Sequence, residues 1–208
     1  MKSLLLLAGL AGLPTLAFAQ SEDTAGPYLG LGTTILTSQP FNQNNGPVLW
    51  GPSLTAGIPL SPHLALELSA GYAWNNKHVE YSYVDFSTGR PILIARDTKE
   101  KIFTFPLLLR VTLTAPASRL RADILGGATF LHSTFSERET GGGSPYSFDN
   151  SSNRAIATLG PGLRFAATPR FELVANALVN YAFFEGGASV SNHLFLNTRL
   201  GVHYTFGE

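Results

Sequence analysis

The stretch from His193 to Phe206 alternates between apolar side chains and polar or small ones, and this alternation constrains the fold more than any other feature. One set of alternate positions holds Leu194, Leu196, Thr198, Leu200, Val202, Tyr204 and Phe206. The positions between them hold Asn197, Arg199, Gly201, His203 and Thr205. A period of two residues is typical of a β-strand with one apolar and one polar face. The segment therefore predicts a strand in a sheet whose two faces meet unlike surroundings.

Seven further segments repeat this alternation, so that the chain predicts eight strands. The eight predicted strands are Pro27–Ile35, Val48–Ile58, His63–Trp74, Phe103–Leu113, Leu120–Phe130, Ala155–Phe165, Phe171–Phe183 and His193–Phe206. Short Pro-containing turns at 59–62, 114–118 and 166–170 alternate with long polar connections at 38–47, 75–101, 136–154 and 185–192. Short turns on one side and longer loops on the other are typical of outer-membrane barrels. We therefore predict an all-β fold, an eight-stranded antiparallel up-and-down transmembrane β-barrel.

The polar faces of these strands carry charges of both signs among many small residues. The charged residues are Glu67, Arg110, Arg121, Asp123, Arg164, Glu172 and Arg199. A lipocalin-like soluble barrel would place the apolar set inside, whereas a narrow eight-stranded lumen accommodates small residues and paired charges. We expect the seven charges to form a network that plugs the lumen, with little or no steady conductance.

Aromatic residues gather at both ends of the apolar faces. The residues expected to form these girdles are Trp50, Tyr72, Trp74, Phe165, Phe171, Tyr181, Phe183, Tyr204 and Phe206, and Phe103 and Phe130 accompany those near the long loops. Two aromatic belts flanking an apolar band are typical of a barrel surrounded by lipid.

Together these patterns resemble the small OmpA-like and OmpX-like barrels of bacterial outer membranes. Phe105-Pro106-Leu107-Leu108-Leu109-Arg110 resembles more particularly the outer membrane protein beta-barrel domain family common in Bacteroidetes, which includes PorT-like proteins. The aromatic close of the last strand also resembles the final strand of such proteins. The resemblance implies a place in the bacterial outer membrane, contact with lipopolysaccharide and insertion by the barrel-assembly machinery. It implies a shared fold but no shared activity.

The N-terminus predicts an export signal. Lys2 precedes an apolar run from Leu4 to Leu13, and Ala17-Phe18-Ala19 fits a cleavage site, so we expect a signal peptide at 1–19 and a barrel domain at 20–208. With 14 basic and 14 acidic residues, the chain has no basic excess of the kind that nucleic-acid binding requires. It has no Cys, and its five His residues are scattered, so neither a metal site nor a cofactor is indicated.

The candidates for catalysis are His132 and Ser133. Some eight-stranded barrels modify lipid A with a Ser-His-acid arrangement at the external rim, and here Ser136, Glu137 or Glu139 could complete one. However, adjacent strand residues point to opposite faces, which favours a structural role for both. We therefore favour a non-enzymatic protein with a structural or surface-interaction role. A lipid A hydrolase or acyltransferase, and less favourably a small-solute porin, stay open as alternatives.

The connection between Trp74 and Phe103 has its own alternation. Val79, Tyr81 and Tyr83 alternate with polar residues, and Ser87-Thr88-Gly89-Arg90 supplies a turn. We expect the third and fourth strands to continue beyond the membrane as a protruding hairpin. Its exposed edge and aromatic residues, Tyr81, Tyr83 and Phe86, are the candidates for recognition of a surface protein or adhesion partner.

Overall fold

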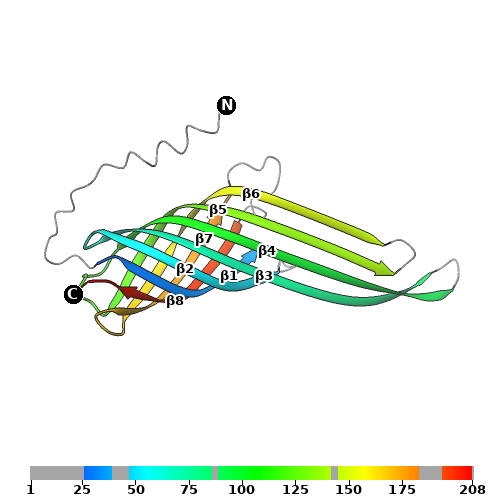
Figure 1. Ribbon diagram of the computed structural model, residues 1–208, viewed down its shortest axis with the longest axis horizontal. Coiled ribbons are helices and arrows are strands. Elements are labelled where there is room, and N and C mark those ends of the chain that lie inside the picture. The colour runs from blue at the N-terminus through cyan, green and yellow to red at the C-terminus, as the bar shows by residue number, and fades with distance from the viewer. Residues whose placement is uncertain (1–25, 39–46, 86–88, 142–144, 183–193, 208) are drawn as a thin grey trace, which may run out of the picture.

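A computed structural model describes residues 26–38, 47–85, 89–141, 145–182 and 194–207. Each strand pairs antiparallel with the next along the chain, and β8 pairs with β1, so that eight strands close a barrel (Figure 1). The strands are β1 (Tyr28–Ser38), β2 (Val48–Ser61), β3 (Leu64–Asp85), β4 (Arg90–Thr112), β5 (Leu120–Gly141), β6 (Tyr146–Ala166), β7 (Phe171–Tyr181) and β8 (Leu194–Thr205). The predicted fold class is confirmed. The expected signal peptide lies outside the described residues.

Within the described part of the chain, no helix is long and apolar enough to cross a membrane. The side chains of the barrel wall alternate between a buried and an exposed face. In β4, Phe105 and Leu107 are 45% and 50% exposed, whereas Thr104 and Arg110 are 3% and 1% exposed. The apolar set therefore faces outward and the polar set faces the lumen. An outer surface made of large apolar side chains is stable only where lipid replaces water.

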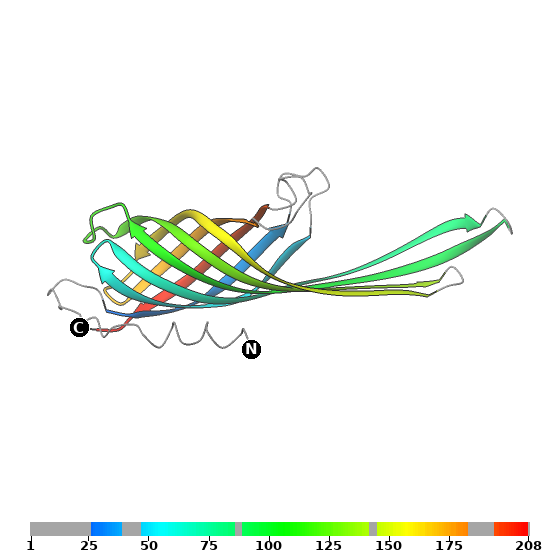
Figure 2. The same ribbon diagram turned by 90° about the horizontal axis from the view of Figure 1, so that it is seen from above.

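The strands differ greatly in length. Strands β1, β2, β7 and β8 have 11, 14, 11 and 12 residues, whereas β3 to β6 have 22, 23, 22 and 21. The pairing of β3 with β2 ends at Trp74, and that of β6 with β7 ends at Ala157. Figure 2 shows the four long strands leaving the barrel together as one twisted sheet. At about 3.3 Å per residue, the part of β3 beyond Trp74 reaches roughly 35 Å.

This protruding sheet, formed by residues 75–85, 90–100, 132–141 and 146–156, extends the prediction in one respect and corrects it in another. The hairpin of β3 and β4 is confirmed, with Gly89 at its tip in the left-handed region at φ +67°. The segment 136–154, however, is not a long polar loop, because β5 and β6 continue through most of it. The reason is pairing: β5 remains hydrogen-bonded to β4 as far as Gly141 opposite Ile94.

Candidate functional site

Seven charged side chains form one continuous chain across the lumen, near the ends of the strands that the short turns connect. In order they are Arg199, Glu67, Arg110, Asp123, Arg164, Glu172 and Arg121, and each neighbouring pair forms an ion pair. Arg110 donates from Nη1 to Asp123 at 2.7 Å, and Arg164 donates from Nε to the same carboxylate at 2.6 Å. The structure thus brings together all seven residues assigned to the lumen, with signs that alternate along the chain.

Neutral groups add hydrogen bonds to the buried carboxylates of this network. Tyr28 donates its hydroxyl to Glu67 at 3.2 Å, and Thr112 donates to Asp123 at 2.8 Å. Gly57 makes room for the Tyr28 ring, since a Cβ there would lie 2.0 Å from Tyr28 Cζ. A buried carboxylate is tolerated only when several donors satisfy it. The network is therefore held from several strands and fills this part of the lumen.

Apolar side chains fill the opposite end of the lumen. Leu36, Leu49, Ala73, Ile102, Leu131, Ile156 and Ala182 form one buried cluster there. Between this layer and the charges, Thr158 donates to Asn180 at 2.7 Å and Thr34 donates to Asn197 at 2.8 Å. This apolar layer differs from the polar interior that the sequence predicted. The sequence does carry a mark of this apolar layer, because residues such as Leu131 occupy inward positions of the alternation.

The candidate catalytic residues lie on opposite faces of β5. His132 faces outward, and its Nδ1 lies 2.7 Å from Asn153 Oδ1. Ser133 faces the opposite side of the strand, and its Oγ is hydrogen-bonded to Ser152 Oγ at 2.8 Å. The two glutamates considered as orienting groups are paired with Arg96 instead, at 3.4 Å and 2.7 Å. Among the described residues, these groups therefore do not form a nucleophile, base and acid relay.

Two aromatic clusters lie at opposite ends of the outward apolar band. Near the protruding sheet, ring centroids of Trp50 and Trp74 are 5.6 Å apart, and those of Tyr72 and Phe103 are 4.5 Å apart. Near the short turns, Tyr204 packs on Phe171 at 5.1 Å and on Phe206 at 5.0 Å. The exposed Phe130 and Phe165 and the half-buried Tyr181 also point outward, whereas Phe183 lies outside the described residues. We call the clusters the outer and inner girdles respectively.

The inner face of the protruding sheet, which continues the lumen face of the barrel, is mixed, with apolar side chains among charged ones such as Lys77, Arg96 and Glu100. Its apolar members are Val79, Tyr81, Tyr83, Ile92, Ile94, Phe135, Tyr146 and Phe148. Arg96 crosses this face, donating from Nη2 to Glu139 at 2.7 Å and to the Tyr81 hydroxyl at 3.3 Å. The expected recognition residues Tyr81 and Tyr83 are 37% and 44% exposed, whereas Phe86 lies outside the described residues. Aromatic area is thus presented to solvent beyond the barrel.

The outer face of the protruding sheet is polar. His78 lies between two carboxylates, with Nδ1 at 2.6 Å from Asp97 and Nε2 at 3.2 Å from Glu80. The hydrogen bond with Asp97, followed by that with Glu80, raises the pKa of His78 above its usual value. The protonated form of His78 is therefore favoured in the part of the protruding sheet where the strands leave the barrel.

The protruding sheet has two edges in the described structure. Beyond Trp74, no described strand pairs with the free side of β3, and beyond Ala157 none pairs with the free side of β6. The β4 side of the predicted hairpin is not an edge, because β5 pairs with it. Unpaired backbone donors and acceptors therefore run along residues 75–85 and 146–153, and they can accept an additional strand.

Comparison with known families places this architecture. A model of the family described as "Outer membrane protein beta-barrel domain" matches residues 3–206. The chain belongs to this family. Two solved structures share the fold: Ail, the attachment invasion locus protein of Yersinia pestis (15% identity, TM-score 0.52), and the outer membrane protein OprG of Pseudomonas aeruginosa (11% identity, TM-score 0.51). The alignments cover 88% of this chain with 100% of Ail and 97% of OprG.

A search of curated protein sequences found no match. The family and the fold place the protein in the bacterial outer membrane, with the apolar band in the lipid bilayer. Outer-membrane barrels are oriented with their short turns on the periplasmic side and their longer connections outside the cell. The protruding sheet of this outer-membrane barrel therefore extends from the cell surface.

Proposed function

We propose that this barrel is a non-enzymatic surface-recognition protein that binds an extended polypeptide segment of an external partner along the free edge of β3. The observation that carries the proposal is the protruding sheet itself, in which β3 continues past Trp74 with its backbone unpaired on one side among the described residues. An extended segment that adds to a sheet edge gains main-chain hydrogen bonds regardless of its sequence.

The β3 edge suits this role better than the β6 edge. Val79, Tyr81 and Tyr83 have high β-propensity and present their side chains beside the edge. The β6 edge also presents Tyr146 and Phe148, but its run from Asp149 to Asn153 consists of residues of low or modest β-propensity. Exposed tyrosines also provide rigid contact area at interfaces. Pairing at β3 would therefore combine backbone bonding with aromatic anchors.

The two alternatives receive less support. For a lipid A hydrolase or acyltransferase, His132 and Ser133 would have to approach each other from opposite faces of β5. For a small-solute porin, the lumen would have to open through both the charge chain and the apolar layer. We further propose that residues 1–19 are removed on export and that the barrel-assembly machinery inserts residues 20–208.

The test compares two matched truncations. In the first, residues 79–96 are replaced by Asn-Gly, which leaves His78 paired with Asp97 and removes the outer part of β3. In the second, residues 138–147 are replaced by Asn-Gly, which leaves Glu137 opposite Phe148 and keeps β3 intact. Both variants should insert in the outer membrane and migrate differently on a detergent gel before and after boiling, because the lipid-facing band is unchanged.

The binding measurement uses phage-displayed peptides selected against the purified full-length barrel. We expect the selected peptides to be extended, alternating sequences that bind the full-length protein and the 138–147 truncation but lose at least tenfold in affinity for the 79–96 truncation. Equal binding to both truncations, or a failure to select any such peptide, would contradict recognition by the β3 edge.

A further inference from the structure

Two lysines stand on the outward face of β4, one at the level of the outer girdle and one immediately beyond it. Lys101 lies opposite Trp74 in the pairing of β3 with β4, and the next outward residue of β4 toward the membrane is Phe103. Lys99 is one outward position farther from the membrane. Because girdle aromatics lie at the level of the lipid headgroups, the two ammonium groups lie at or just above the headgroup layer of the outer leaflet.

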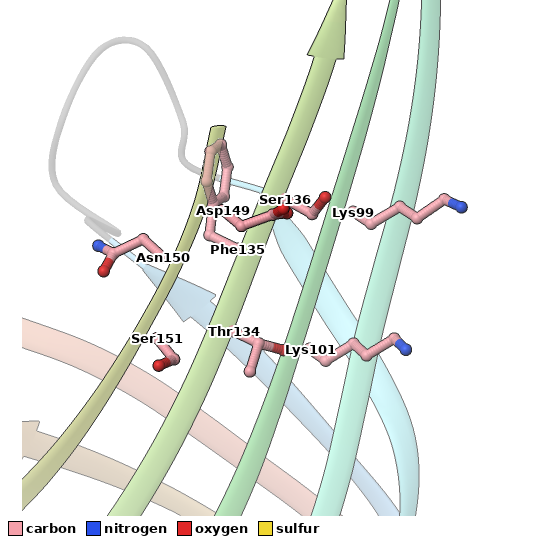
Figure 3. Close-up of a pocket in the computed structure, with 8 residues that line it drawn as sticks. All are labelled: Lys99, Lys101, Thr134, Phe135, Ser136, Asp149, Asn150 and Ser151. Carbon is pink, nitrogen blue, oxygen red and sulfur yellow. The ribbon is translucent and has the colours of Figure 1, made fainter. Parts of the chain in front are cut away.

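The positive charge of these lysines is not neutralised by the sheet. Both side chains are exposed, and neither forms an ion pair with any residue that the structure describes. Their charged neighbours behave differently, since Asp97 is paired with His78 and Arg96 is paired with Glu139. Figure 3 shows the side chains of Lys99 and Lys101 extending in the same direction, away from Asp149. Two uncompensated cations at this height favour an anionic headgroup.

Hydroxyl groups extend the site across the neighbouring strands. Two rows of paired residues cross the sheet here: Trp74, Lys101, Thr134 and Ser151 in one, and Asn76, Lys99, Ser136 and Asp149 in the other. The lysines and the residues of β5 and β6 line a hollow of about 410 Å³ (Figure 3). Hydroxyl and ammonium groups both donate to phosphate oxygens, whereas Asp149 at the far side can accept hydrogen bonds from sugar hydroxyls. The mixture suits a phosphorylated sugar better than a bare phosphate.

We propose that Lys99 and Lys101 bind the phosphate of a phosphorylated glycolipid of the outer leaflet, and that its sugar lies in the hollow toward Ser136 and Asp149. The acyl chains would then lie along the outward apolar residues Phe103, Phe105 and Leu107, which are 41%, 45% and 50% exposed. The site is independent of the proposed strand recognition, which uses the β3 edge. It ties the base of the protruding sheet to the membrane surface.

The experiment measures binding of phosphorylated lipid A to the purified barrel in nanodiscs by native mass spectrometry. The variant carries Lys99→Gln and Lys101→Gln together. The matched control is Lys77→Gln, because Lys77 is an exposed lysine on the opposite face of the same sheet. From about 1 kcal/mol per lysine near an anionic surface, the double variant should bind roughly 30-fold more weakly. The control should bind like the unmodified protein, and added salt should weaken binding to the unmodified protein.

The ligand is varied in parallel with the protein. Enzymatically dephosphorylated lipid A should bind the unmodified barrel as weakly as phosphorylated lipid A binds the double variant. Inorganic phosphate at millimolar concentration should not displace the lipid. Equal affinity of the two lipids, unchanged binding by the double variant, or displacement by inorganic phosphate would each overturn the proposal, the last by identifying a site for free phosphate.

Discussion

The barrel wall and the protruding sheet are built from the same strands, yet their outward faces differ in polarity. Along β4, the outward positions Leu107 and Phe105 lie in the apolar band, whereas Asp97 and Lys99 take the same face beyond the outer girdle. On the other face, β4 is mixed in both regions, with Arg110 and Leu108 in the lumen and Arg96 and Ile94 in the protruding sheet. The period of two is continuous, and only the chemistry of the outward face changes.

This change shows that alternation determines which residues share a face, while the surroundings determine whether the outward face is apolar. Lipid surrounds the wall, so the polar groups gather where other protein groups can satisfy them. Outside the membrane, water contacts both faces of the protruding sheet, and the polar face no longer needs enclosure. The predictions below test this contrast with the same substitution made in each region.

The largest difference is expected for removal of an arginine. Arg110→Met leaves Glu67 and Asp123 without a shared partner in a site where Arg110 is 1% exposed, so the free energy of unfolding should fall by roughly 3–5 kcal/mol. Arg96→Met removes a partly exposed pair in the protruding sheet, and the loss should be much smaller because solvent screens this pair. Urea unfolding in lipid vesicles measures both values. Similar losses for the two variants would show that the lumen network is not a special environment.

A smaller difference is expected for insertion of an arginine on the outward face. Leu107→Arg places a charge in the middle of the lipid-facing part of β4 and should cost roughly 2–4 kcal/mol. Leu93→Arg makes the same change on the outward face of the protruding sheet, where Leu93 is already 63% exposed, and should leave stability unchanged. The same unfolding assay applies. If Leu93→Arg is as harmful as Leu107→Arg, residue 93 lies in lipid and the membrane boundary drawn at the outer girdle is misplaced.

The sequence was sufficient to predict the barrel because alternation is a local property. Eight runs with short and long connections in turn identify the strands, and charged residues such as Arg110 and Asp123 mark the lumen face. The order in which these charges pair was not predictable. Arg164 meets Asp123 from a neighbouring strand, and this contact depends on the stagger of the closed barrel.

The extension of β5 and β6 could not be predicted from the sequence either. The stretch from Ser136 to Asn153 is rich in Ser, Asn, Asp, Glu and Gly, which favour turns and loops. Residues 136–141 and 146–153 become strand because the outer part of β4 offers unpaired backbone groups to β5, and β5 offers them in turn to β6. Pairing with a neighbour overrides a weak local preference. The same logic supports the proposal that β3 accepts one more strand from outside the chain.

The smallest expected effect concerns His78, whose two carboxylate partners belong only to the protruding sheet. Because these partners raise its folded-state pKa above the unfolded value of about 6.5, the stabilisation by His78 is complete below that value. It is lost as the pH rises through the raised pKa. Amides near His78 in β3 and β4 should therefore lose protection against hydrogen exchange over this pH range, after correction for the intrinsic rate, while amides of the barrel wall stay unchanged. Asp97→Asn should lower the His78 pKa measured by NMR titration, since the hydrogen bond with Asp97 is its largest cause. An unchanged His78 pKa in that variant would show that the pair at 2.6 Å does not persist in solution.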